Sequence, residues 1–304
     1  MDLKQMKYFL CLVQEGNVTR AAGQLNIVQP ALSMQIAKLE THFGKKLFHR
    51  SAYGVSLTAA GEKLAELASE LVQNAANVQE EMDRLDGTIY GRVSIGMITS
   101  AAQSTLAASS AKIAAQFPGI QLLVCEGYTN SLLEWVNTGQ IDIAIINMPP
   151  TKPALPIHPI VEEGLMLAHS VSAKAQPANF SFRSLQDMDI VIPSRRHGLR
   201  AILDDMATKA DFILKPRLEI DTLSAICEIV ATTELVTVLP GIALHPALSA
   251  RRIKAHRIRR PDVTRSVAWV THPRRTVTAA MAAVMKIIGK DLVSAAKSVK
   301  FAGR

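Results

Sequence analysis

The sequence has few of the features that mark secreted, membrane or redox proteins. Only three cysteines occur in 304 residues, and Cys11, Cys125 and Cys227 stand far apart. This spacing excludes a local metal-ligand motif and a close thiol pair, and it favours small buried hydrophobic roles. No run of about 18 uncharged apolar residues exists, and the start of the chain lacks a signal-peptide core. We therefore expect a soluble, cytoplasmic protein.

The usual catalytic signatures are also missing. The sequence contains no GxSxG nucleophile elbow, no P-loop, no GxGxxG and no cluster of metal ligands. The histidines are scattered, which favours structural or surface roles. We therefore expect no enzyme activity, no cofactor and no metal.

The net charge of +8 is unevenly distributed along the chain. Residues 1–58 are only modestly basic, whereas residues 251–304 hold 14 Lys and Arg against two acidic residues. In the densest run, residues 251–260, apolar residues interrupt the basic ones. This pattern favours an exposed strand and loop, with a second nucleic-acid surface as the alternative.

Two short helices around a three-residue turn are the most informative feature of the sequence. Residues 17–25 begin with Asn17, a good helix cap, and carry small residues on one face, as a closely packed helix does. Residues 26–28 break the pattern. A second helix then begins at Gln29 and turns its leucine and isoleucine side chains inward.

The outward face of this second helix suits DNA bases. It presents Gln29, Ser33, Met34 and Lys38 to solvent. A Gln side chain can make two hydrogen bonds to adenine, Ser can donate or accept, and Pro30 and Met34 can contact a thymine methyl group. The alternative is a solvated helix face without a partner.

The flanking sequence favours DNA binding over the solvated face. Apolar residues at positions 3, 6, 10 and 13 predict a further helix behind the pair. Residues 43–58 are typical of a strand, a glycine turn and a second strand. Such a wing presents Arg50 and the tip at 51–54 to phosphate or to the minor groove.

Many residues of this region also match one family pattern at fixed spacing. The matches are Leu3, Tyr8-Phe9, Thr19-Arg20-Ala21-Ala22, Leu25, Gln29-Pro30-Ala31-Leu32-Ser33, Gln35-Ile36, Leu39-Glu40, Gly44, Leu47-Phe48, Arg50 and Leu57-Thr58-Ala59-Ala60-Gly61. In these residues the chain resembles the amino-terminal domain of LysR-type transcriptional regulators. The resemblance implies a winged helix-turn-helix in which Gln29, Pro30, Ser33 and Met34 face bases. We expect further DNA contacts from Thr19, Arg20, Lys38, Arg50 and Tyr53.

Two residues depart from the family pattern. Val28 stands where a Ser or Thr usually caps the second helix, and loss of such a cap costs about 1 kcal/mol. Met34 stands where a basic residue is frequent, which puts one expected guanine contact in question.

A proline-free segment from Thr58 to about Leu85 carries a heptad pattern. Its apolar residues are spaced alternately by four and three: Leu64, Ala68, Leu71, Ala75, Val78, Met82 and Leu85. This pattern predicts a helix of roughly 40 Å, at 1.5 Å per residue, that pairs with a second copy of the chain. The alternative is an amphipathic helix packed on its own domain.

From residue 91 onward, short apolar runs alternate with helical stretches. We expect strands at 92–97, 121–125, 141–146, 164–168, 190–192, 217–220, 235–239 and 267–270, and helices at 104–116, 131–138, 198–208, 223–232 and 277–293. Such alternation predicts an α/β domain with a parallel sheet and helices on both faces.

Weaker matches to LysR-type regulators continue in this part. They are residues 91–96, 117–120, 139–145 and 238–240. The resemblance implies two Rossmann-like lobes of periplasmic-binding-protein type, joined by two crossing strands around an effector cleft. The expected domains are a winged helix-turn-helix at 1–58, a linker and dimerisation helix with its hinge at 59–90, and an effector-binding domain at 91–304. Lobe I would span 91–162 and 266–304, and lobe II 163–265.

Candidate effector residues follow the predicted strands, because ligands of open α/β sheets bind beyond the carboxyl ends of the strands. Thr99 and Ser100 follow the first strand and suit an anion at a helix start, with helix capping as the alternative. Across the cleft, Arg195 and His197 belong to a basic helix start that would be unfavourable without an anion. This stretch resembles the nitrogen-assimilation-control branch of the family. Further candidates are Thr129, Asn147 and Thr222.

Together these features predict a sequence-specific DNA-binding transcriptional regulator that a small acidic metabolite modulates. An effector that closes the lobes would change how dimers associate, and so alter DNA bending and contact with RNA polymerase. Homodimers or homotetramers would bind an inverted repeat with half-sites about one helical turn apart. The alternatives are a sensor similar to solute-binding proteins and a regulator that senses no small molecule.

Overall fold

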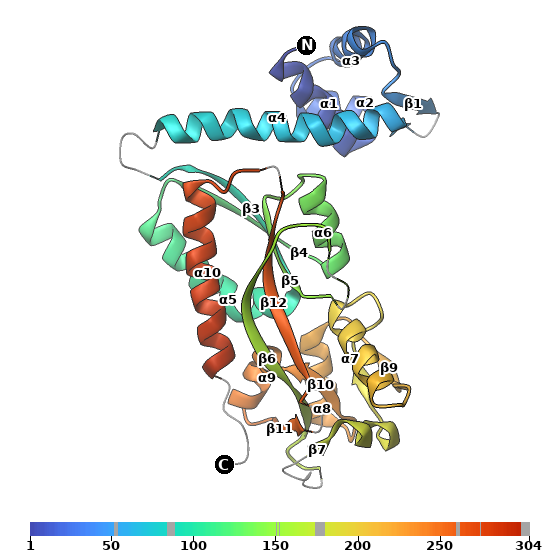
Figure 1. Ribbon diagram of the computed structural model, residues 1–304, viewed down its shortest axis with the longest axis vertical. Helices are drawn as coiled ribbons and strands as arrows, with labels where there is room; N and C mark the ends of the chain where they lie inside the picture. Colours follow the sequence, from blue (N-terminus) through green and yellow to red (C-terminus); the bar gives the residue numbers. More distant parts are fainter. Residues whose placement is uncertain are drawn as a thin grey trace. The chain divides into compact units, whose positions relative to one another are not determined.

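The computed structural model describes residues 1–51, 54–83, 89–149, 151, 153–173, 180–259, 262–273 and 275–298 (Figure 1). Its contacts divide the chain into two units. The first is residues 1–88 with the short segments 138–140 and 274–278, and the second is residues 89–137, 141–273 and 279–304. Within the described ranges, none of the helices has the length and apolar character needed to cross a bilayer.

The first unit begins with three helices and a two-stranded wing. In chain order its elements are α1 (Leu3–Glu15), α2 (Val18–Gln24), α3 (Gln29–Phe43), β1 (Phe48–Ser51), β2 (Gly54–Leu57) and α4 (Ala59–Asp83). The side chain of Asn17 caps α2 by accepting hydrogen bonds from the backbone N–H groups of Thr19 and Arg20. Helix α3 starts after Val28 with no side-chain cap, as the sequence predicts.

Apolar faces of these elements meet in one core. Its buried members are Met6, Phe9, Leu12, Ala21, Ala22, Leu32, Ile36, Leu39, Leu47, Phe48 and Ala68. The wing is fixed to this core by a close backbone contact, because the N–H of Val55 donates to the carbonyl of Gly16 at 2.9 Å. Only glycine fits at position 54, since a Cβ atom there would lie 2.5 Å from the carbonyl oxygen of Gly16.

Helix α4 divides its heptad stripe between two environments. Thr58 caps the helix, as predicted, by accepting a hydrogen bond from the N–H of Gly61 at 3.0 Å. Leu64 and Ala68 pack into the core of the first unit, so this part of the stripe is not available to a second copy of the chain. For these turns of α4, the alternative of packing on its own domain holds. Further along, apolar stripe residues stay exposed: Leu71, Val78 and Met82. Leu85 lies outside the described residues.

A mixed sheet runs through the second unit. Strands β3 (Gly91–Met97), β4 (Ile120–Glu126) and β5 (Ile143–Asn147) are parallel, whereas β12 (Thr264–Thr271) is antiparallel to both β5 and β6 (Ile157–Ser170). The strand order is β4-β3-β5-β12-β6-β11-β7, with β11 at Ile253–Arg259 and β7 at Phe180–Ser181. Strand β10 (Thr237–Pro240) pairs with β6, and β8 (Val191–Ile192) pairs with β9 (Leu218–Glu219). The predicted parallel sheet is therefore confirmed for β3, β4 and β5 and wrong for β6 and β12, which cross the unit antiparallel to each other.

Helices flank this sheet (Figure 1). They are α5 (Thr99–Gln116), α6 (Thr129–Asn137), the 3-10 helix η2 (Phe182–Asp187), α7 (Gly198–Lys209), α8 (Leu223–Thr232), α9 (Gly241–Ser249) and α10 (Ala279–Ser298). Helix α5 starts well before the predicted residue 104. Helix α9 is not expected from the sequence, since Pro240 precedes it and Pro246 lies inside it, and prolines are poor helix residues.

Two separate cores define two lobes. Lobe I is built from β3, α5, β4, α6, β5 and α10 around buried residues such as Ile95 and Val284. Lobe II is built from β7, η2, α7, α8, β10, α9 and β11 around residues such as Leu203 and Val238. Strand β6 contributes Ile160 to the first core and Leu167 to the second, so it runs through both lobes.

Candidate functional site

The outer face of α3 carries the polar side chains that the sequence places there. Gln29, Pro30, Met34 and Lys38 are exposed and Ser33 is half-buried, while the leucines and Ile36 on the opposite face are buried. A helix with this division has one face fixed in the core and one free to enter a groove.

The other predicted DNA-contact residues lie around this helix. Thr19, on α2, directs its hydroxyl to Oε1 of Gln29 at 3.4 Å. Arg20 is exposed, and its guanidinium donates to the backbone carbonyl of Glu15. Arg50 is exposed on strand β1 of the wing. Tyr53 lies outside the described residues.

A small pocket lies between the two lobes of the second unit. It has about 360 Å³ of space free of protein atoms, part of which is open to solvent. The residues that line it are Thr129, Asn130, Asn147, Pro149, Arg195, Arg196, His197, Gly198 and Ala201. Helices α6 and α7 both begin at this pocket. Two helix starts at one pocket favour an anion, since each start carries partial positive charge.

Two buried polar atoms at the pocket have no protein partner among the described residues. They are the hydroxyl of Thr129 and the amide nitrogen Nδ2 of Asn147. Their residues are only 3% and 1% exposed. Leaving such a group unsatisfied typically costs about 1 to 3 kcal/mol, so both are available to bind a polar molecule.

Gly198 brings the lobes into close contact at this pocket. A Cβ atom there would lie 2.6 Å from Oγ1 of Thr129 and 3.4 Å from Nδ2 of Asn147. Any larger residue would therefore force α7 away from α6.

Beneath the pocket lies a buried arginine that sequence reasoning missed. Nε of Arg265 donates to Oε1 of Glu163 at 2.8 Å, and Nη1 donates to Oγ of Ser100 at 3.0 Å and Oδ1 of Asn147 at 2.9 Å. The contact through Oδ1 leaves Nδ2 as the free end of the Asn147 amide. Ser100 therefore faces Arg265. Nothing in the sequence around residue 265 separates it from the many other basic residues of this region.

The basic start of α7 is less charged than its sequence indicates. His197 caps the helix, because its Nδ1 accepts from the N–H of Leu199 at 3.2 Å. Burial, and after it the positive charge of Arg265, lowers the pKa of His197 to about 4. This histidine is therefore neutral near pH 7.

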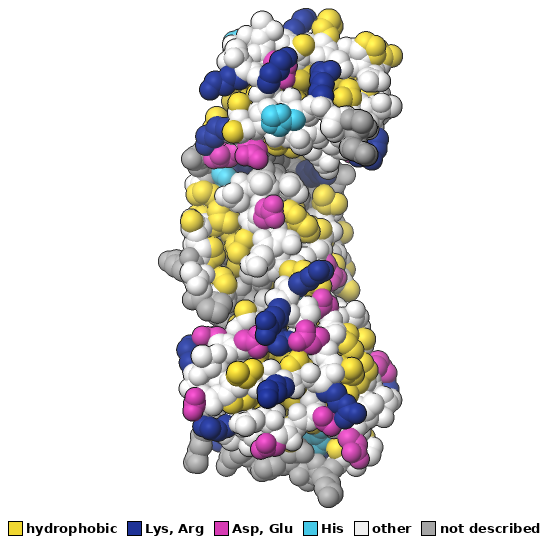
Figure 2. Space-filling model, turned by 90° about the vertical axis from the view of Figure 1, so that its right-hand side faces the viewer, with side chains coloured by type: hydrophobic (Ala, Val, Ile, Leu, Met, Phe, Trp, Pro, Cys, Tyr) yellow, Lys and Arg dark blue, Asp and Glu magenta, His cyan; other side chains and the backbone are white. Residues whose placement is uncertain are grey.

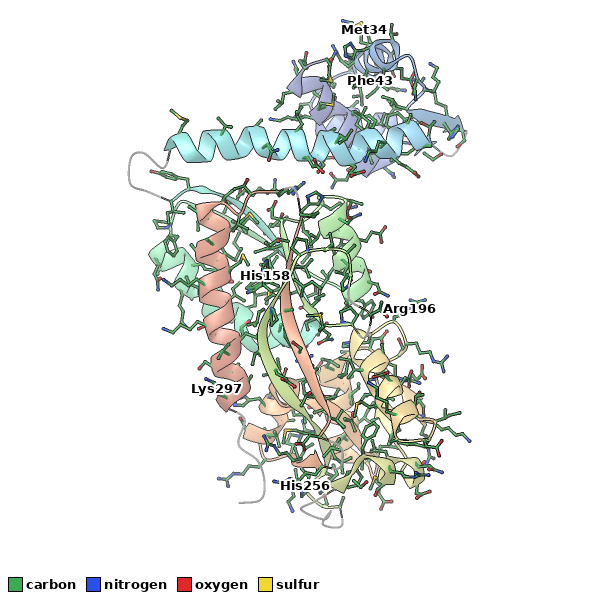
Figure 3. All side chains as sticks on the ribbon, in the orientation of Figure 1. Met34, Phe43, His158, Arg196, His256 and Lys297 are labelled. Carbon is green, nitrogen blue, oxygen red and sulfur yellow. The ribbon has the colours of Figure 1, made fainter. Side chains whose placement is uncertain are left out.

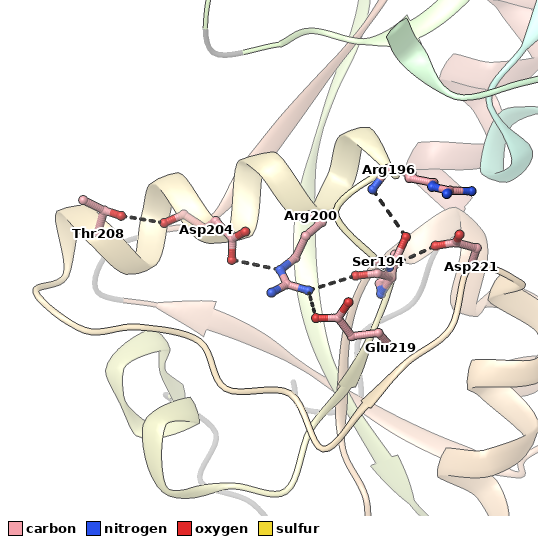
Figure 4. A network of polar contacts seen from close by, with 8 residues as sticks. Ser194, Arg196, Arg200, Asp204, Thr208, Glu219 and Asp221 are labelled. Carbon is pink, nitrogen blue, oxygen red and sulfur yellow. Dashed lines mark hydrogen bonds and ion pairs between the residues drawn. The ribbon is translucent and has the colours of Figure 1, made fainter. Parts of the chain in front are cut away.

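Arg200 is also withdrawn from the pocket (Figure 4). Its guanidinium is buried and binds Asp204 at 2.9 Å, Glu219 at 2.8 Å and the carbonyl of Pro193 at 3.3 Å. Acidic side chains of lobe II therefore balance this cation. Of the basic residues at this helix start, Arg195 and Arg196 remain exposed at the pocket.

Next to the pocket, a carboxylate joins the lobes. Oδ2 of Asp221 accepts from the hydroxyl of Tyr128 at 2.9 Å, and Oδ1 accepts from the N–H of Ser194 at 2.9 Å. Burial opposes ionisation of Asp221, but the hydrogen bonds from Ser194 and Tyr128 outweigh it and lower its pKa. Tyr128 belongs to lobe I and the other two residues to lobe II.

The pocket thus gathers some of the predicted effector residues and not others. Thr129, Asn147, Arg195 and His197 line it, whereas Thr99, at the start of α5, and Thr222, which is exposed before α8, do not. The alternative of helix capping by Thr99 and Ser100 is also wrong, because Ile98 holds the N-cap position of α5 with no side-chain cap. Among the described residues, no three His, Cys, Asp or Glu side chains could hold a metal ion.

Two family models match the chain. The model described as a bacterial regulatory helix-turn-helix protein of the lysR family matches residues 3–62, and the model of the LysR substrate binding domain matches residues 87–292.

Relatives and solved structures resemble nearly the whole chain. The nitrogen assimilation regulatory protein nac of Klebsiella aerogenes is 26% identical over 289 residues, 95% of this chain and 94% of that protein. The hydrogen peroxide-inducible genes activator of Haemophilus influenzae is 26% identical over 274 residues, which are 90% and 91% of the two chains. A full-length OxyR variant from Pseudomonas aeruginosa has a similar fold, with a TM-score of 0.77 at 20% identity over 100% and 99% of the two chains. Full-length CbnR complexed with its target DNA has a TM-score of 0.62 at 18% identity over 96% and 100% of the two chains.

Proposed function

The chain belongs to the LysR family of bacterial transcriptional regulators, and we propose that it reads its operator through α3 while the interlobe pocket senses a small organic anion. The family assignment makes the protein a DNA-binding regulator with an effector domain. The anionic nature of the effector, its site and the individual DNA contacts are our proposals.

The pocket supports an anion through its donors. The unpartnered hydroxyl of Thr129 lies at the start of α6, and the unpartnered Nδ2 of Asn147 lies at the end of β5. Arg195 and Arg196 stand at the same pocket. Charge-assisted hydrogen bonds from such groups to a carboxylate are stronger than neutral ones. The small volume favours a compact acid.

We further propose how the signal reaches DNA. Residues 59–90 would pair two copies, the effector would stabilise one arrangement of the lobes, and the resulting dimers or tetramers would bend the operator and contact RNA polymerase in the cytoplasm. We propose no catalytic role, since the pocket's side chains do not combine a nucleophile with a neighbouring base.

One observation favours a regulator that senses no small molecule. The Tyr128–Asp221 hydrogen bond joins the lobes through the protein's own side chains. In that case the lobes would stay in one arrangement and the amount of protein would set its output.

A thermal-shift screen of the full-length protein distinguishes these possibilities. Small organic acids and their neutral amides form matched pairs of probes, and a ligand at 100 times its Kd stabilises the fold by about 2.7 kcal/mol. We expect the acid alone to raise the Tm, and Thr129→Val to abolish the rise. Equal shifts by acid and amide, or an undiminished shift in Thr129→Val, would contradict the anion site.

The proposed DNA contacts have a separate test. We expect Arg50→Ala to weaken binding to specific and random DNA alike and to reduce the salt slope by about one, as loss of a phosphate contact does. Gln29→Ala should weaken the specific site by about 1 to 3 kcal/mol and leave random DNA nearly unchanged. Equal losses on both kinds of DNA for Gln29→Ala would exclude base readout by that residue.

A further inference from the structure

The reading end of α3 carries no basic side chain. The helix has no Lys or Arg before Lys38, although its amino-terminal turns are the ones that reach base edges in helix-turn-helix proteins. Met34 is 52% exposed and Val28 is 69% exposed. Figure 3 shows Met34 projecting from the outer side of α3.

Helix capping does not explain Val28, and core packing does not explain Met34. Val28 occupies the N-cap position and makes no side-chain cap, so it forfeits a hydrogen bond that Ser, Thr, Asp or Asn would provide. Met34 leaves about half of its surface in water and lies one turn beyond Pro30, on the same stripe of the helix. On the face drawn in Figure 2, hydrophobic side chains of the first unit lie among basic ones.

We propose that Met34 makes operator recognition depend on the 5-methyl groups of thymine, and that this end of α3 does not read guanine. The inference rests on the proposed DNA reading by α3. The thymine methyl is the apolar group that A·T pairs display in the major groove, whereas guanine is read through O6 and N7 by Arg or Lys. The flexible thioether side chain of Met can adapt its contact to a methyl group.

Gln29 supplies the complementary contact. Its Oε1 accepts from Thr19 at 3.4 Å, which orients the amide while one lone pair of Oε1 and both hydrogens of Nε2 remain available. An amide held in this way can pair with N6 and N7 of adenine. Gln29 and Met34 on neighbouring stripes of α3 would therefore read adjacent A·T pairs.

The test begins with selection of operators by the full-length protein from a random duplex library. We expect each enriched half-site to contain a thymine next to an adenine. Uracil then replaces each thymine in turn, which removes the methyl group and leaves every base hydrogen bond unchanged. At one position per half-site we expect about threefold to fivefold weaker binding by the wild type, the value of one buried methyl group.

Variants assign this methyl contact to its residue. Met34→Ala should bind the thymine and uracil operators equally, and Met34→Arg should select guanine near that position. Phe43→Ala is the matched control, because Phe43 is an exposed apolar residue at the far end of α3. It should keep the full thymine preference.

The possible failures are distinguishable. If uracil weakens Met34→Ala as much as the wild type, or the selected sites lack thymine at a fixed place, the inference about Met34 is overturned while operator binding stands. If selection enriches no sequence at all, both the inference about Met34 and the proposed DNA reading by α3 are overturned. If Met34 instead contacts another protein, neither Met34→Ala nor the replacement of thymine by uracil would change operator binding. This outcome also overturns the inference.

Discussion

The hydroxyl of Tyr128 donates a 2.9 Å hydrogen bond to Asp221, and this bond joins lobe I to lobe II beside the pocket. A bond to the ionised carboxylate is stronger than one between neutral groups, and the same bond raises the pKa of Tyr128. Because the two side chains come from different lobes, the bond exists only when the lobes are close. It therefore biases the second unit toward closure.

We expect Tyr128→Phe to shift this equilibrium toward an open form. Hydrogen bonds to charged groups contribute about 1.5 to 3 kcal/mol to stability. The Tyr128–Asp221 bond is half-buried, which favours the lower value. Hydrogen exchange of the backbone amides at the start of α7 should then be roughly tenfold faster, as a loss of about 1.4 kcal/mol implies. Tyr90→Phe is the control, because Tyr90 is exposed elsewhere in the second unit. Unchanged exchange in Tyr128→Phe would show that other contacts hold the lobes.

The buried ion pair between Arg265 and Glu163 leads to a second prediction. Arg265→Met should lower the free energy of unfolding by about 3 to 5 kcal/mol, because it leaves Glu163 buried without its partner. The double variant with Glu163→Gln removes both charges and should recover much of the loss. Urea unfolding of the three proteins measures both steps. A double variant no more stable than Arg265→Met would show that lost packing, not the uncompensated charge, causes the effect.

Arg265 also marks the limit of what the sequence reveals. Local patterns suffice for the helix-turn-helix, since Asn17, the turn at 26–28 and the inward apolar residues of α3 act within a few positions of one another. Strands were predicted at 164–168 and 267–270, within β6 and β12, but their antiparallel pairing was not, because it joins Glu163 to Arg265 across about a hundred residues of chain. The pocket was found only in part for the same reason: Ser100, Asn147 and Arg265 meet through tertiary contacts that no local spacing encodes.

The exposed part of the α4 stripe yields a prediction about assembly. Leu71 is 44% exposed, while Leu64 and Ala68 of the same stripe pack inside the first unit. Leu71→Asp should place like charges face to face in a paired helix and give monomers in analytical ultracentrifugation. Leu71→Met should remain oligomeric, since it keeps the apolar contact. Persistent dimers in Leu71→Asp would place the interface elsewhere in the chain.

The last prediction concerns Gly198, whose missing side chain lets α7 approach α6. In Gly198→Ala the new Cβ would lie 2.6 Å from Oγ1 of Thr129, a distance at which something must move, and α7 is the part that can shift because it belongs to the other lobe. We expect faster hydrogen exchange at the start of α7 and loss of the thermal shift by acids, with operator binding in the absence of effector nearly unchanged. Adding Thr129→Ala to Gly198→Ala removes the nearest atom and leaves the Cβ contact at 3.2 Å, which small shifts can relieve. Exchange should then return most of the way to the wild-type rate, although acid binding stays lost with the Thr129 hydroxyl. If the double variant exchanges as fast as Gly198→Ala, the steric contact with Thr129 does not control closure.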